Sequence, residues 1–124
     1  MEELNFDVVI VGGGPAGSSA AHMAAKNGCT VALIEKEKEI AQTVRTSGVT
    51  WISDIKEFGI PEECYNPIKK FSFCSPKNTV KISDDVAKAA VLDVRKTYRF
   101  LADRAKASGS NVFTSTNVLE VLKD

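Results

Sequence analysis

A glycine-rich segment, Gly12-Gly13-Gly14-Pro15-Ala16-Gly17, lies between an apolar run and a run of small residues. Residues 6–11, Phe-Asp-Val-Val-Ile-Val, predict a strand that is buried on both faces of a parallel sheet. A helix is expected from Pro15 to Asn27, because proline suits a first helical turn and the following Gly28 suits a helix end. Thr30 to Ile34 predicts a second strand. Together these runs predict one right-handed βαβ unit.

Each glycine of this GxGxxG sequence has a physical task. Gly12 permits a tight turn, Gly14 lets the backbone approach a pyrophosphate, and Gly17 allows close packing of helix on strand. The free N–H groups and the positive dipole end of the helix then face the diphosphate. Glu35 ends the second strand, where its carboxylate can accept hydrogen bonds from adenosine ribose hydroxyls and would repel a 2′-phosphate. The residues therefore predict a site for ADP, argue against NADP, and leave FAD and NAD both open.

The rest of the chain departs from regular alternation of strand and helix. The expected elements are a polar connection over Ala41 to Thr50, a short helix over Trp51 to Phe58, a β-hairpin of Ile68 to Cys74 and Thr79 to Ile82, a strand or extended lead-in over Val86 to Val94, a helix over Arg95 to Ser108, and short strands over Asn111 to Thr114 and Val118 to Leu122. The sequence thus predicts an α/β, Rossmann-like dinucleotide-binding domain with a parallel sheet, a βαβ N-terminus and an inserted hairpin.

Composition narrows the class of protein. The 124 residues fit one domain or part of one, and sixteen basic residues balance sixteen acidic ones, so charge gives no argument for a nucleic-acid partner. Cys29, Cys64 and Cys74 form no CxxC pair, and His22, the single histidine, cannot complete a zinc site with them. We therefore expect that the protein binds no metal and that its thiols are reduced, as in a cytoplasmic protein. We also expect no transmembrane segment, because no apolar run is long enough to cross a bilayer. His22 is interpreted as a solvated or capped residue rather than a catalytic base.

Two segments carry a family resemblance. Asp7 to Ala21 (Asp-Val-Val-Ile-Val-Gly-Gly-Gly-Pro-Ala-Gly-Ser-Ser-Ala-Ala) and Val31 to Lys36 (Val-Ala-Leu-Ile-Glu-Lys) resemble the N-terminus of flavoproteins with two dinucleotide-binding domains. Within that class the chain is most similar to the geranylgeranyl reductase family, whose archaeal members saturate isoprenoid lipid chains; para-hydroxybenzoate-hydroxylase-like monooxygenases share the scaffold. The similarity continues over Val91 to Val121. Val44 to Val49 departs from the family's Val-Arg-Cys-(Gly/Ala)-Glu-Gly, since Thr46 replaces the cysteine and the acidic residue is missing.

The resemblance implies FAD as the cofactor and a set of binding positions. Ala16 and its neighbours match pyrophosphate contacts, Glu35 a ribose contact, Arg95 a cofactor-contacting arginine, and Val118 a backbone position near the adenine; Arg45 either meets phosphate or stays solvated. The implied cofactor-binding residues are Gly12, Gly13, Gly14, Pro15, Ala16, Gly17, Glu35, Lys36, Arg45, Thr46, Ser47, Gly48, Arg95 and Val118. No residue is assigned as a catalytic acid or base.

Flavoproteins of this class are several times longer than this chain. We therefore expect residues 1–124 to be the N-terminal part of an FAD-binding domain, an incomplete fragment without a substrate domain and too short for turnover alone. The leading hypothesis is a flavin-dependent oxidoreductase that reduces isoprenoid or related double bonds, with contact to a membrane surface left open. The alternatives are an NAD-binding Rossmann module, against which the expected hairpin counts, and a non-catalytic truncated remnant. The sequence indicates neither the electron donor nor the oligomeric state.

Overall fold

The computed structural model describes residues 2–123. They divide into two compact units. The first unit contains the described residues up to Val44 and those from Tyr98 onward, and the second contains Arg45–Thr97.

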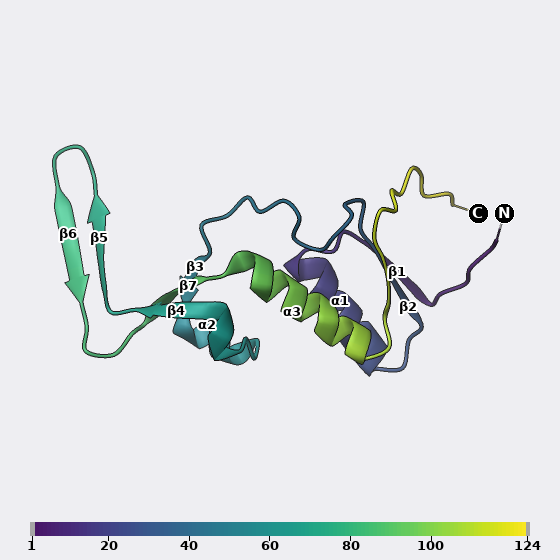
Figure 1. The fold of residues 1–124 in the computed structure, drawn as a ribbon, viewed down its shortest axis with the longest axis horizontal. Coiled ribbons are helices and arrows are strands. Elements are labelled where there is room, and N and C mark those ends of the chain that lie inside the picture. Colours follow the sequence, from purple (N-terminus) through teal and green to yellow (C-terminus); the bar gives the residue numbers. More distant parts are fainter. Residues whose placement is uncertain (1, 124) are drawn as a thin grey trace. The chain divides into compact units, whose positions relative to one another are not determined.

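The first unit is built on a three-stranded parallel sheet (Figure 1). Its strands are β1 (Val8–Val11), β2 (Val31–Ile34) and β8 (Asn111–Phe113), in the order β1-β2-β8, and helix α1 (Pro15–Lys26) connects the first two. The parallel register pairs Ile10 with Leu33, and Ile34 with Phe113. The βαβ unit and the parallel sheet that the sequence predicts are confirmed, but β1 is not buried on both faces, because Val9 and Val11 are 55% and 61% exposed.

The core of the first unit lies between this sheet and two helices. Helix α3 (Val94–Ala107) begins in the second unit and runs through the first from Tyr98 onward. Ala21 of α1, Val31 and Leu33 of β2, and Ala105 of α3 are fully buried in one apolar cluster. Small residues at these helix positions let both helices approach the sheet closely. Not every small residue of α1 faces this core, because Ala20 is exposed.

Hydrogen bonds also join α1 to the segment that directly follows α3. The Ser110 hydroxyl donates to the carbonyl oxygen of Ala21 over 3.0 Å. His22 Nδ1 lies 2.6 Å from Ser108 Oγ, so this ring is half-buried and partnered. The ring of His22 is thus partnered rather than fully solvated, and its lack of a catalytic role stays a prediction.

The second unit is an antiparallel arrangement. Its elements are β3 (Val49–Trp51), α2 (Ile52–Glu57), a 3-10 turn η1 (Glu62–Cys64), β4 (Tyr65–Ile68), the hairpin β5 (Lys70–Cys74) and β6 (Thr79–Ser83), and β7 (Ala89–Leu92). The sheet order is β3-β7-β4, and within this unit the β5–β6 hairpin extends as a separate ribbon (Figure 1). The inserted hairpin and the short helix are confirmed, and the segment that was either a strand or an extended lead-in is the strand β7.

Three expectations need correction. The end of the polar connection forms β3, which pairs with β7. β4 was not expected; it contains Pro67 and lies at a sheet edge, where a proline is tolerated because one side of the strand needs no ladder bonds. Val118 to Leu122 forms no strand within residues 2–123, and Leu119 is 90% exposed there. An alternating pattern alone does not make a strand when no neighbouring strand supplies hydrogen bonds.

Candidate dinucleotide-binding site

The turn from β1 to α1 depends on two glycines. Gly12 has a φ of +104°, a backbone conformation that side chains rarely adopt, and its N–H donates to the carbonyl oxygen of Ile34 over 2.7 Å. A Cβ on Gly17 would collide with the carbonyl oxygen of Gly12. The chain can therefore make this turn only with glycine at both positions, as the motif predicts.

The N-terminus of α1 is open in front of Gly14. A Cβ on Gly14 would meet no heavy atom within 4 Å, and this N-cap residue provides no side-chain hydrogen bond to the helix. Ser18 N donates to the Gly14 carbonyl oxygen over 2.9 Å, which starts the helical ladder and leaves the N–H groups of Ala16 and Gly17 without intrahelical acceptors. Pro15 at the start of the helix has no N–H to satisfy. Open space beside free N–H groups at a helix N-terminus fits a diphosphate.

The Glu35 carboxylate is fixed beside this turn. One of its oxygens accepts the Gly13 N–H over 2.8 Å, and the other accepts the Glu37 N–H over 2.9 Å. Each carboxylate oxygen has a second lone pair, so the group can still accept hydroxyl donors. The geometry brings Glu35 to the glycine turn, where an adenosine ribose would follow the diphosphate.

The segment after β8 is hydrogen-bonded to the residues that follow β2, beside Glu35. Thr116 N donates to the Glu35 carbonyl oxygen over 3.0 Å, and Ser115 N donates to that of Glu37 over 2.8 Å. Ser115 has a φ of +52°, an uncommon conformation for a residue other than glycine. Val118 is half-buried just beyond this contact, while Lys36 is exposed. Of the expected positions, the structure therefore brings together Gly12 to Gly17, Glu35 and the segment that leads to Val118.

The remaining expected positions belong to the second unit. Arg45, Thr46 and Ser47 are exposed. Gly48 is buried with a φ of +78°, and a Cβ there would lie 2.8 Å from the carbonyl oxygen of Leu92, so this glycine is required by local packing. Arg95 is exposed in the first turn of α3. Their roles toward a cofactor stay predictions.

Three residues near the glycine turn were missed by the sequence reading. Ser18 is fully buried and its hydroxyl donates to the Gly13 carbonyl oxygen over 3.2 Å; its position directly after Gly17 was the available signal. Ile40 packs on Gly13, and Arg99 contacts the loop that carries Ile40. Neither Ile40 nor Arg99 was singled out from the sequence, because their contacts join positions far apart in the chain.

The second unit also has an apolar groove of about 440 Å³. Its lining comes mainly from β3 and from β5 of the hairpin, with one residue each from β4 and β7: Val49, Thr50, Trp51, Ile68, Phe71, Ser72, Phe73 and Ala89. Phe71 and Phe73 contact each other edge to face, and Trp51 is 54% exposed. Within the described residues no cluster of side chains fits a metal ion, and no helix has the length and apolarity that a membrane crossing needs.

Comparison with known proteins agrees with this geometry. A family model of FAD dependent oxidoreductases matches residues 7–124. The digeranylgeranylglycerophospholipid reductase of Methanocaldococcus jannaschii is 38% identical over 130 residues, covering all of this chain and 33% of the relative. A protein of Methanosarcina barkeri named for the 5′ region of nifH2 is 31% identical, covering 96% of this chain and 70% of its own length.

Solved structures show the same relationship. A geranylgeranyl bacteriochlorophyll reductase-like protein from Thermoplasma acidophilum matches with a TM-score of 0.87 and 31% identity, over 96% of this chain and 32% of that protein. A flavin-dependent brominase, with a TM-score of 0.75 and 24% identity over 96% of this chain and 31% of its own, shares the fold. The chain spans about a third of the length of the reductase relatives it matches.

Proposed function

Because the chain belongs to the FAD dependent oxidoreductase family, we propose that it forms the ADP-binding part of a flavin-dependent reductase for isoprenoid or related double bonds. FAD is the cofactor of this family. The observation that carries the proposal is the glycine turn with Glu35 beside it, at the open N-terminus of α1. In this proposal residues 1–124 are the N-terminal part of an FAD-binding domain.

The residues of the chain bind and orient the cofactor in this proposal. The N–H groups of Ala16 and Gly17 donate to the diphosphate, and the absence of a side chain at Gly14 lets the phosphates approach the backbone. Glu35 accepts the ribose hydroxyls and is itself oriented by the N–H groups of Gly13 and Glu37. When bound, FAD supplies the isoalloxazine ring that carries out hydride chemistry. The second-unit positions Arg45 to Gly48 and Arg95 are proposed contacts to the remainder of the cofactor.

The names of the relatives supply the substrate class. The reductase relative from Methanocaldococcus jannaschii is named for a digeranylgeranyl glycerophospholipid, whose chains contain isoprenoid double bonds. We propose the same class of substrate for the reductase whose ADP-binding part this chain forms. In this proposal the protein is cytoplasmic. Because a lipid of this kind resides in a bilayer, the protein reaches it from the membrane surface as a peripheral protein. The apolar groove of the second unit is in keeping with a lipid-handling protein.

Flavin retention by the purified chain tests the proposal. The chain is incubated with FAD and desalted, and its visible absorption spectrum is recorded beside that of Glu35→Gln, which keeps the size of the side chain and removes its charge. We expect flavin bands in the wild type and about tenfold weaker binding in the variant, because a charge-assisted hydrogen bond is lost. Absence of flavin bands and of any ADP binding by calorimetry would refute the proposed site.

A further inference from the structure

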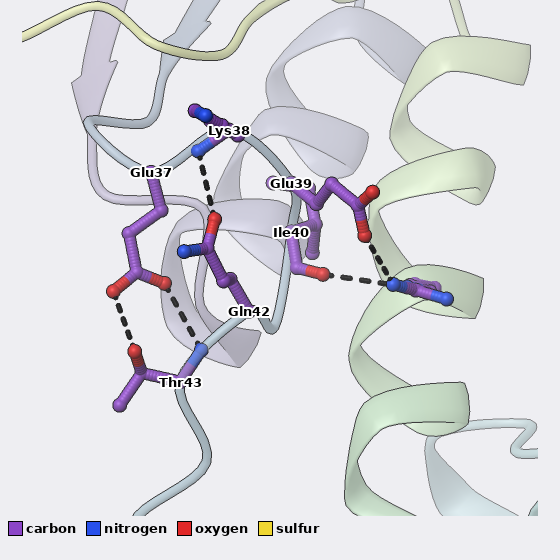
Figure 2. Close-up of polar contacts among 7 residues, drawn as sticks. Glu37, Lys38, Glu39, Ile40, Gln42 and Thr43 are labelled. Atoms are coloured by element: carbon purple, nitrogen blue, oxygen red, sulfur yellow. Dashed lines mark hydrogen bonds and ion pairs between the residues drawn. The ribbon is translucent and has the colours of Figure 1, made fainter.

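The loop after β2 is closed by its own hydrogen bonds. Figure 2 shows both carboxylate oxygens of Glu37 directed at Thr43, one accepting the hydroxyl over 2.7 Å and the other the N–H over 3.1 Å. Between these two residues along the chain, the Lys38 N–H donates to Gln42 Oε1 over 3.1 Å. Ala41 has a φ of +60°, which a residue with a side chain adopts only when its surroundings impose it. Hydrogen bonds within the 37–43 loop therefore fix its conformation.

One side chain of the 37–43 loop packs on the glycine turn. Ile40 is only 7% exposed, although it is flanked by charged and polar residues. Its terminal methyl lies so close to Gly13 that a Cβ on Gly13 would collide with it. The N–H of the same Gly13 donates to Glu35, and Glu35 in turn accepts the N–H of Glu37 at the start of the loop. The position of Ile40 is thus coupled to the orientation of the Glu35 carboxylate.

Arg99 of α3 contacts this loop at Ile40 itself and at the preceding residue, Glu39. Its Nη2 lies 2.6 Å from Glu39 Oε2, and its Nε donates to the carbonyl oxygen of Ile40 over a longer 3.4 Å. In Figure 2 the dashed lines from Glu39 and Ile40 converge on one side chain of the neighbouring helix. The planar guanidinium can keep both contacts at once, which a single ammonium group does less well.

We propose that Arg99 is a positioning residue for the cofactor. By holding Glu39 and the Ile40 backbone, it keeps Ile40 against Gly13 and fixes Glu35 in the orientation that accepts the adenosine ribose. In this proposal Arg99 acts on the ligand only through the 37–43 loop. The inference rests on the proposed function, because it assigns to Arg99 a role in binding FAD through that same site.

The exposure of the ion pair separates this role from simple stabilisation. The side chains of Arg99 and Glu39 are 47% and 66% exposed, and surface ion pairs of this kind contribute little to folding. Loss of the pair should therefore change the unfolding temperature little. It should affect ligand binding more, because a misplaced carboxylate weakens every contact made to the ribose.

The test compares two arginine variants with a matched lysine variant on the same helix. Arg99→Gln removes both contacts, Arg99→Lys keeps the charge, and Lys106→Gln removes an equal charge together with a surface pair to Asp103. Dissociation constants for FAD and for ADP are measured by calorimetry, and unfolding temperatures are recorded without ligand. Arg99→Gln is also made in the Glu35→Gln background. Hydrogen exchange of the Gly13 amide in the ligand-free chain reports on the turn itself.

We expect Arg99→Gln to weaken FAD and ADP binding about three- to tenfold, with partial recovery in Arg99→Lys and no change in Lys106→Gln. In the Glu35→Gln background the effect of Arg99→Gln on affinity should vanish, and Gly13 exchange should be faster in Arg99→Gln alone.

Equal affinities of wild type and Arg99→Gln, or an undiminished effect in the Glu35→Gln background, would overturn the inference while leaving the proposed function intact. Failure of the wild type to bind either ligand would reject the proposed function instead, and unchanged Gly13 exchange would then reject the positioning role as well.

Discussion

At the residue scale, Gly14 and Gly17 belong to one motif but meet opposite surroundings. A Cβ on Gly17 would enter the carbonyl oxygen of Gly12, whereas a Cβ on Gly14 would enter open space. We expect Gly17→Ala to destabilise the fold by about 1–3 kcal/mol, because the backbone must shift to relieve the overlap. Gly14→Ala should leave the unfolding free energy nearly unchanged and weaken FAD binding about tenfold or more, because the methyl group occupies the approach to the diphosphate.

Urea unfolding and FAD titration on the two variants measure both quantities. The prediction is a crossed pattern, with stability lost in one variant and affinity in the other. Gly14→Ala binding FAD as tightly as wild type would show that the phosphates do not approach the turn at this position.

Ala41 offers a second test of backbone conformation. A left-handed residue with a Cβ costs about 1–2 kcal/mol, and glycine avoids that cost. We expect Ala41→Gly to stabilise the chain by up to about 1 kcal/mol, since the entropy that glycine loses on folding offsets part of the gain. The control is Ala24→Gly in helix α1, which should destabilise by about 1 kcal/mol. Thermal unfolding of the pair gives the comparison, and equal losses in both variants would contradict the assigned conformation of the 37–43 loop.

The cysteines differ in environment at the same scale. Burial raises the pKa of the Cys64 thiol, and the negative charge of Glu63 raises the pKa further, so the thiolate is disfavoured in the folded chain. Cys74 is exposed on β5. At pH 8, iodoacetamide should label Cys74 rapidly and Cys64 only after unfolding in urea, as followed by mass spectrometry of peptides. Labelling of Cys64 at the rate of Cys74 in the native chain would show that the second unit opens readily.

At the element scale, a polar cluster joins the segments that lead into β1 and β2. The Asp7 carboxylate accepts the backbone N–H and the hydroxyl of Thr30, each over 2.7 Å, and these bonds lower the pKa of Asp7, the backbone bond most. Because the folded pKa lies below the unfolded value of about 4, the stabilisation is present above that value and is lost as pH falls through the folded pKa.

Unfolding free energies measured between pH 7 and pH 2 should therefore decline less steeply below pH 4 in Asp7→Asn than in wild type. Glu3→Gln, which removes another exposed carboxylate near the N-terminus, serves as the control and should keep the slope of the wild type. If the unfolding free energies of wild type and Asp7→Asn fell equally steeply below pH 4, the contact to Thr30 would not contribute to the joining of the two strands.

Local sequence determined some elements of the fold and not others. The βαβ unit and the β5–β6 hairpin were predictable because strand, turn and helix signals lie next to one another in the chain. β3 and β4 were missed because both are short and form only by pairing with β7, which lies much later in the sequence. The Val118 to Leu122 segment shows the reverse case, since its alternation suggested a strand that has no pairing partner among the described residues.

At the scale of the whole molecule, the candidate site was predictable where it depends on the motif. Gly12, Gly17 and Glu35 lie as the GxGxxG pattern requires. The contacts of Ile40 to Gly13 and of Arg99 to Ile40 could not be read from the sequence, because they arise when α3 packs beside the β2 loop. Such long-range contacts have no local signature, so the supporting residues of a site emerge only from the tertiary structure.

The apolar surface of the molecule leads to a last prediction. Trp51, the single tryptophan of the chain, borders the groove of the second unit and is 54% exposed, and Phe73 beside it is 61% exposed. Exposed apolar patches of this kind mark contact sites for other molecules. The fluorescence of the dilute chain should therefore resemble that of tryptophan in water and be quenched readily by acrylamide.

Adding the aromatic anion ANS should lower the Trp51 emission and raise that of the dye, because a dye molecule bound in the groove accepts energy from the indole ring. Val49→Glu, which places a negative charge in the same lining, should repel the sulfonate and reduce dye binding while leaving the unfolding temperature nearly unchanged, since Val49 is itself exposed. A blue emission without dye that weakens on dilution would instead mean that a second copy covers the groove. A blue emission independent of concentration would contradict the exposure of Trp51 within the second unit.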